Sequence, residues 1–162
     1  MRARTCLHHT PPPRTLRATA SAMPRKLPLV TPDTAAFWQD GEHGRLMIHH
    51  CAGCSRWFHP PAPVCPHCNA LTVAPKSVSG RGTVATFTVN HQAWTPELAE
   101  PYVVAIVELD DQPGLRVLSN VIGIAPEQVR IGLRVQVRFE QQEDVWLPLF
   151  APSATALDVA RP

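Results

Sequence analysis

The stretch CAGCSRWFHPPAPVCPHC, residues 51 to 68, holds four of the chain's five cysteines in two pairs. Each pair encloses two residues, and ten residues separate the pairs. A Cys-x-x-Cys turn lets two sulfurs reach one ion, and two such turns complete a tetrahedron with zinc–sulfur distances of about 2.3 Å. The spacing therefore predicts a metal site formed by Cys51, Cys54, Cys65 and Cys68.

The residues around the cysteines suit a tight metal-binding loop. Ser55 and Asn69 directly follow the two pairs, and Asn readily enters the left-handed backbone region that such turns use. Prolines between the pairs stiffen the loop and reduce the entropy lost when it closes. They are Pro60, Pro61, Pro63 and Pro66.

Other readings of the cysteines are weaker. Disulfides are disfavoured in a cytosolic protein, and no signal peptide indicates another compartment. A redox-active pair needs one such motif and not two. Nearby histidines are possible substitutes for a cysteine ligand, although four thiolates already suffice. They are His49, His50, His59 and His67.

Four protein ligands leave no open coordination position for water or substrate, so we expect the metal to be structural. Iron accepts the same four thiolates. Zinc is favoured, because nothing else in the sequence indicates electron transfer.

Length and composition indicate a globular protein. The 162 residues fit one domain or two very small ones. Eighteen prolines are about twice the usual share, which favours loops and short strands. No apolar run approaches the length of about 20 residues needed to span a bilayer. We expect a cytoplasmic protein without a membrane span.

Charge is divided unevenly along the chain. Residues 1–26 carry six basic residues and no acid, and we expect a disordered leader or a misassigned start, with Met23 as the alternative first residue. From residue 27 onward, nine basic residues face thirteen acidic ones, a net charge of −4. Nucleic-acid-binding domains are normally basic, so this balance argues against such a partner.

Turn signals and alternation predict the secondary structure. Thr31-Pro32-Asp33 begins a short helix that Gly41 and Gly44 should end. Residues 45–50 read as a strand leading into the cysteines. Five further strands follow at 82–91, 102–109, 115–123, 133–140 and 145–150, with DDQPG as a hairpin turn.

Two details refine the strand prediction. In residues 133–140, apolar and polar side chains alternate, so Leu133, Val135, Val137 and Phe139 should face inward. Pro148 cannot donate to a strand ladder, which places the last strand at a sheet edge.

The predicted fold is mainly β. Residues 27–44 form the N-terminal helix segment, 45–75 the zinc ribbon and 76–150 a five-stranded OB-fold barrel, before a flexible tail at 151–162. The single helical turn expected between the third and fourth barrel strands is typical of an OB-fold. An SH3-like barrel is the main competitor.

No catalytic motif stands out. The chain contains no nucleophile elbow, phosphate-binding glycine loop or HExxH sequence. The glycines of Ser79-Gly80-Arg81-Gly82 more simply permit a sharp entry into the first barrel strand.

The order of RLMIHHCAGC, FHPPAPVCPHC, SGRGTVATFTV, PYVVAIVELD and LPLFAPS resembles a family that joins a rubredoxin-like zinc ribbon to an OB-fold, long catalogued as a domain of unknown function. The resemblance covers roughly residues 33 to 152. It implies a non-catalytic accessory subunit of thiolase-like enzymes, aldolases or hydratases that act on acyl-CoA, with suspected contact to the acyl-CoA itself. By the same resemblance, the four cysteines are metal ligands.

A single-stranded nucleic-acid binder is the alternative class, since zinc ribbons and OB-folds both serve that purpose. The acidic body favours the accessory subunit.

Two sets of residues are candidates for contacts. Exposed apolar groups are candidates for the enzyme interface, and they are Phe37, Trp38, Trp94 and Leu98. Basic residues of the barrel are candidates for the CoA phosphates, and they are Arg81, Arg116, Arg134 and Arg138.

Overall fold

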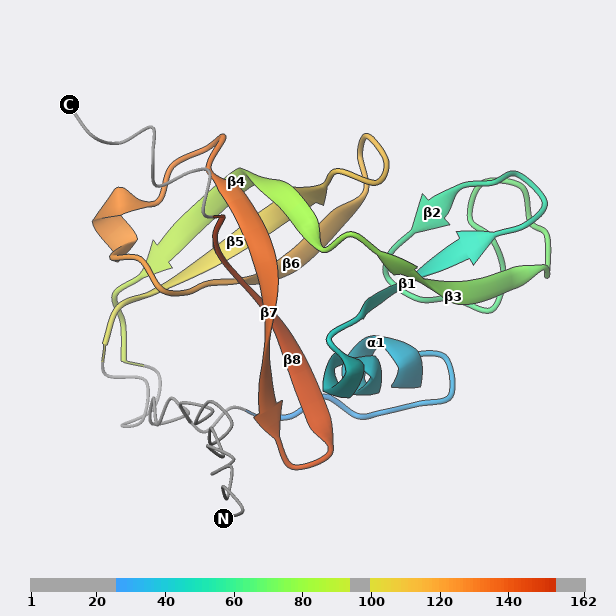
Figure 1. Cartoon of the computed structure of the whole chain (residues 1–162), viewed down its shortest axis with the longest axis horizontal. Helices are drawn as coiled ribbons and strands as arrows, with labels where there is room; N and C mark the ends of the chain where they lie inside the picture. The colour runs from blue at the N-terminus through green and yellow to red at the C-terminus, as the bar shows by residue number, and fades with distance from the viewer. Residues whose placement is uncertain (1–25, 94–99, 154–162) are drawn as a thin grey trace, which may run out of the picture.

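The computed structural model describes residues 26–93 and 100–153. A short helical segment and a small sheet precede a five-stranded barrel, and the small sheet projects from one side of the barrel (Figure 1). None of the helices in these two ranges has the length and apolar character that a membrane crossing requires.

The helical segment consists of α1 (Ala35–Gln39) and the 3-10 helix η1 (Asp40–His43). Gly44, at φ 69°, ends it and donates to the carbonyls of Asp40 and Gly41. The prediction that Gly41 ends the helical segment is wrong. Gly41 lies inside η1, where a Cβ atom would come within 2.5 Å of the Trp146 side chain. Close packing against the barrel therefore explains this glycine.

The small sheet contains β1 (Leu46–Cys51), β2 (Trp57–Phe58) and β3 (Val73–Val78), in the antiparallel order β2-β1-β3. Sequence patterns did not predict β3, because four of its six residues are exposed and no alternation results. The boundary expected between ribbon and barrel, at residues 75 and 76, falls inside this strand.

The barrel comprises β4 (Arg81–Asn90), β5 (Tyr102–Leu109), β6 (Arg116–Val121), β7 (Arg134–Gln142) and β8 (Val145–Pro152). It closes in the order β4-β5-β6-β8-β7, with the single turn η3 (Pro126–Gln128) between the third and fourth strands. These elements confirm the predicted OB-fold barrel.

The prediction that Pro148 marks a sheet edge is wrong, because β8 lies between β6 and β7 in a closed barrel. The closed barrel accommodates Pro148, which has no N–H to donate, because β6 and β8 pair at only one position, Val121 with Phe150. The Pro148 carbonyl instead accepts a hydrogen bond of 2.6 Å from the Ser119 hydroxyl. Strand β8 also includes residues 151 and 152, which had been assigned to the tail.

The main core joins the barrel to the base of the small sheet and to α1. The alternation predicted for β7 is confirmed, since Leu133, Val135 and Val137 are buried and Phe139 packs against the core. Phe37, Leu46 and Ile48 belong to the same buried cluster. The helix and the first strand of the ribbon are therefore packed on the barrel as one body.

Gly80 connects β3 to β4, as predicted for a sharp entry into the barrel. Its φ is 67°, and a Cβ atom there would lie 2.4 Å from a Val137 methyl group. Glycine meets both demands, because it accepts positive φ and has no Cβ.

Candidate metal centre

The four predicted cysteines lie together at the end of the small sheet. Their sulfur atoms are all within 4.8 Å of one another. The Cys51 and Cys68 sulfurs are 3.6 Å apart, and those of Cys54 and Cys65 are 3.7 Å apart. A tetrahedron with zinc–sulfur bonds of about 2.3 Å has edges of about 3.8 Å. The arrangement therefore fits a tetrahedral zinc ion and is too wide for disulfides.

The turns that present the sulfurs have the predicted backbone. Ser55 and Asn69 have φ values of 57° and 60°, in the left-handed region expected from their positions after each pair. The two turns are tied down by backbone hydrogen bonds from Cys51 to the carbonyl of Arg56 and from Cys65 to that of Ala70. These bonds hold the two turns in the conformation that brings the four thiols together.

Electrostatics explains why the cluster needs a cation. The backbone N–H of Cys54 points at the Cys51 sulfur and lowers the pKa of that thiol to about 7, against the effect of burial. The backbone of Ala70 also lowers the pKa of Cys68, but the neighbouring sulfurs and burial outweigh it and raise that pKa to about 12. One thiolate forms readily, whereas four together require a divalent metal.

The nearby histidines do not join the sulfur cluster. His49 is buried, and its Nδ1 lies 3.1 Å from the carbonyl oxygen of Ala62. His50 packs edge-on against Trp57, and His59 packs against Phe37. Among the described residues, the group of potential metal ligands that lies close enough together consists of the four cysteines.

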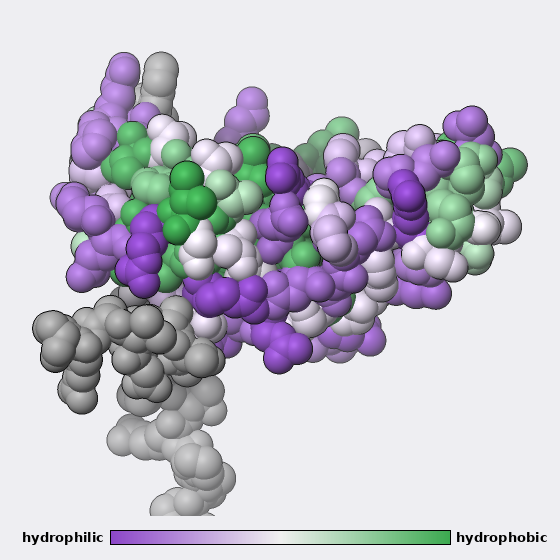
Figure 2. Space-filling model, turned by 90° about the horizontal axis from the view of Figure 1, so that it is seen from above, coloured by the Kyte–Doolittle hydropathy of each residue, from purple (hydrophilic) through white to green (hydrophobic). Residues whose placement is uncertain are grey.

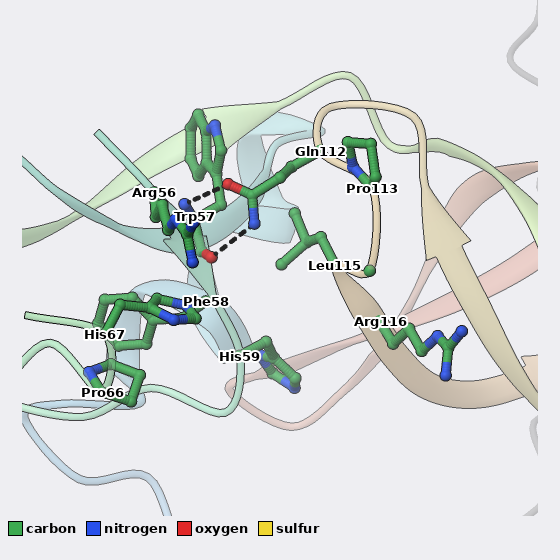
Figure 3. A pocket seen from close by; sticks show the side chains of 11 residues that line it. Arg56, Trp57, Phe58, His59, Pro66, His67, Gln112, Pro113, Leu115 and Arg116 are labelled. Carbon is green, nitrogen blue, oxygen red and sulfur yellow. Dashed lines mark hydrogen bonds between the residues drawn. The ribbon is translucent and has the colours of Figure 1, made fainter. Parts of the chain in front are cut away.

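Gln112, in the turn between β5 and β6, holds the ribbon against the barrel. Its Oε1 accepts a hydrogen bond of 2.9 Å from the Trp57 N–H, and its Nε2 donates one of 3.0 Å to the Trp57 carbonyl (Figure 3). It thereby pairs with the exposed edge of β2 as a neighbouring strand would. Asp111, beside it, accepts two further bonds from Ser79. Sequence reasoning treated this turn only as a hairpin connection and missed both roles.

A pocket of about 470 Å³ lies at this junction. Ribbon residues from Arg56 to His59, together with His67, face barrel residues from Gln112 to Arg116 across it (Figure 3). The bidentate bond of Gln112 forms part of its wall.

The four candidate arginines do not form one cluster. Arg116 pairs with Glu108 at 3.0 Å. Arg134 donates to both carboxylate oxygens of Asp110 and lowers the pKa of that carboxyl. Arg81 and Arg138 are exposed on β4 and β7. Arg116 lies apart on β6, at the junction pocket.

The candidate interface residues differ in how far the structure exposes or describes them. Phe37 is only 5% exposed and packs edge-on against Trp38 at 4.7 Å, so its assignment to an exposed contact surface is wrong. Its apolar ring completes the core between helix and barrel. Trp38 is half-buried against that core. Trp94 and Leu98 lie outside the described residues.

Fold and site together define a zinc-ribbon protein with a five-stranded OB-fold barrel. A model of the ChsH2 rubredoxin-like zinc ribbon domain matches residues 38–73, and a model of the ChsH2 C-terminal OB-fold domain matches residues 76–140.

Curated proteins of similar sequence support this result. The chain is 36% identical over 130 residues to a probable enoyl-CoA hydratase alpha subunit of Thermomonospora curvata, which covers 80% of this chain and 40% of that protein. It is 30% identical over 103 residues to a DUF35 domain-containing scaffold protein of Pyrococcus furiosus, covering 62% of this chain and 74% of the relative.

A solved structure shows the same fold. A chain of the Ltp2-ChsH2(DUF35) aldolase is 35% identical and superposes with a TM-score of 0.70, covering 78% of this chain and 98% of that one. The chain therefore belongs to the DUF35 family, as its motif order indicated.

Proposed function

We propose that the chain is a non-catalytic accessory subunit that docks onto and stabilises a thiolase-like, aldolase or hydratase enzyme of acyl-CoA metabolism. The observation that carries this proposal is its similarity to nearly the whole of the DUF35 chain in the aldolase complex. The hydratase subunit of similar sequence supports the same class of enzyme.

The site chemistry agrees with a structural role. Four cysteine ligands would occupy all the coordination positions of a tetrahedral zinc ion, which leaves none for water or substrate. Zinc bound there would hold the two turns together and supply no reaction step. The chain's contribution would then lie in its surface, and Arg81 and Arg138 are the barrel arginines best placed to meet CoA phosphates, since Arg116 and Arg134 are already paired.

The test is co-expression with Ltp2, the aldolase of the solved complex, followed by size-exclusion chromatography and an aldolase assay. We expect a co-eluting complex and a more soluble, more active aldolase than Ltp2 expressed alone, which is the control. If Ltp2 is equally soluble and active alone, no complex elutes, and no thiolase-like, aldolase or hydratase enzyme co-purifies with the chain from its native host, the accessory role is refuted. Submicromolar binding of single-stranded DNA at physiological salt would favour the nucleic-acid class instead.

A further inference from the structure

Strand β5 is apolar on its inner face and over the middle of its outer face. Val103, Ala105, Val107 and Leu109 point into the core and are buried. The residues between them, which face outward, include Val104 and Ile106. An antiparallel strand with one solvated face normally alternates apolar with polar residues, whereas a strand covered on both faces is apolar throughout. The middle of β5, around Val104 and Ile106, therefore has the sequence of a strand with a second covering layer, whereas Glu108 near its end does not.

The neighbouring strands extend this outer face. Ile106 lies between Thr86 on β4 and Leu118 on β6, and Val104 lies opposite Thr88. Leu118 is 68% exposed. We call these five residues the outer patch: Thr86, Thr88, Val104, Ile106 and Leu118. They line a shallow hollow of about 220 Å³.

A second hollow of about 410 Å³ lies farther along β4 and β5. Its lining includes Ala85 and Ile131, which is 67% exposed, together with the paired acids Glu108 and Asp110. Figure 2 shows hydrophobic surface over the barrel, separated from the far end of the ribbon by a mostly hydrophilic band.

The charges that border the patch are already neutralised. Glu108 and Arg116 pair with each other at the next position along β5 and β6. Asp110, farther along, is paired with Arg134. Among the residues that the structure describes, none of those that line the hollow of the outer patch is charged. Complementarity of charge therefore requires an occupant whose contacting surface is apolar and uncharged.

We propose that the outer patch is the apolar centre of the surface that docks onto the acyl-CoA enzyme, against an uncharged apolar region of that enzyme. This inference rests on the proposed function. Five side chains are fewer than the roughly 20 to 30 residues per side of a stable interface, so the patch acts as the centre of a wider contact.

Other occupants fit the patch less well. A single nucleic-acid strand would need free cations and stacking aromatics, and Phe87, the aromatic residue that lines the hollow, packs against the core. Pockets that enclose small ligands are usually about 300 to 1,000 Å³. The outer hollow is smaller than that, so a buried acyl chain is disfavoured.

Leu118→Glu tests the proposal, with Thr86→Glu as a second variant because both side chains are exposed and tolerate a polar replacement. The matched control is Leu71→Glu, which changes a leucine that is 77% exposed on the ribbon. Zinc content and melting temperature establish that each variant is folded. Binding to purified Ltp2 is then measured by titration and size-exclusion chromatography, alongside wild type.

We expect at least a 10-fold loss of affinity for Ltp2 in Leu118→Glu and Thr86→Glu, and wild-type affinity in Leu71→Glu. If the patch variants bind Ltp2 as wild type does, or only Leu71→Glu loses binding, the docking surface is refuted while the accessory role stands. If wild type binds neither Ltp2 nor any acyl-CoA enzyme that co-purifies with it from its native host, both fail. A wild-type dimer that Leu118→Glu converts to a monomer would make a second copy the occupant and overturn the proposal.

Discussion

His59 shows how one residue is governed by its surroundings. It follows β2, and its ring packs on Phe37 at a centroid distance of 4.7 Å. Its Nδ1 is buried, and no hydrogen-bond partner for it is found within residues 26–93 and 100–153. Burial, with a smaller contribution from the charge of His49, lowers its pKa from 6.5 to about 4. The fold therefore holds this side chain neutral.

We predict a specific loss of stability on acidification. An unfolded His59 binds a proton below pH 6.5, and the folded one does so only near pH 4, so the free energy of unfolding falls between these values by up to about 1.4 kcal/mol per pH unit. His59→Leu should remove this contribution. Denaturant unfolding at pH 6.5 and 4.5 should show wild type losing about 2 kcal/mol more than His59→Leu.

The control is His91→Leu, at an exposed histidine, which should parallel wild type. Zinc release at low pH affects all three proteins, so only the difference between them reports on His59. If wild type and His59→Leu lose the same free energy of unfolding between pH 6.5 and 4.5, the lowered pKa of His59 is contradicted.

At the scale of elements, the turn between β5 and β6 connects the two parts of the molecule. Gln112 completes the edge of β2, Asp111 holds Ser79 at the end of β3, and Asp110 pairs with Arg134 on β7. Three consecutive polar residues thus contact three different elements. The turn sets how the ribbon is oriented against the barrel.

We predict that Gln112→Leu loosens the ribbon without removing its metal. The change keeps a similar side-chain volume but leaves the Trp57 N–H and carbonyl without their partner, which costs about 1 to 3 kcal/mol for a buried group. Hydrogen exchange at the Trp57 amide should accelerate while zinc content stays at one per chain. Gln39→Leu, at an exposed position on α1, is the control. Unchanged exchange at Trp57 would refute the role of Gln112.

The described residues form one large hydrophobic cluster and two small ones. The main cluster spans the barrel, α1 and the first strand of the ribbon. The other end of the ribbon depends on Cys51, Phe58 and Cys65, with few partly buried neighbours. Such a small cluster cannot offset the entropy of ordering two turns. Metal binding, worth about 10 to 16 kcal/mol in zinc-finger peptides, must supply the difference.

We predict that Cys51→Ser abolishes zinc binding and unfolds the ribbon from residue 51 to residue 72 while the barrel stays folded. Elemental analysis should find no zinc, amide exchange should lose protection in β2 but retain it in β5 and β7, and exposure of Phe58 should lower solubility. Cys6→Ser, outside the described residues, is the control and should bind zinc normally. Loss of barrel protection together with zinc would show that ribbon and barrel unfold as one unit.

Features that depend on neighbouring residues could be predicted from the sequence. The cysteine spacing predicted the ligand set, Ser55 and Asn69 indicated the turns, and alternation along β7 assigned its inward face. Each rests on chain geometry over a few residues, which the order of residue types already determines. The family resemblance depended on the order of several such motifs.

Tertiary structure decided what depends on residues far apart in the chain. Burial of Phe37, closure of the barrel past Pro148 and the bond from Gln112 to Trp57 each join segments that no local pattern relates. Strand β3 was missed because it is held by β1 and not by its own apolar pattern. In β5, only the closed barrel decided that Val104 and Ile106 lie on the outer face while Val103 and Ala105 lie in the core, because the core covers one side of a strand.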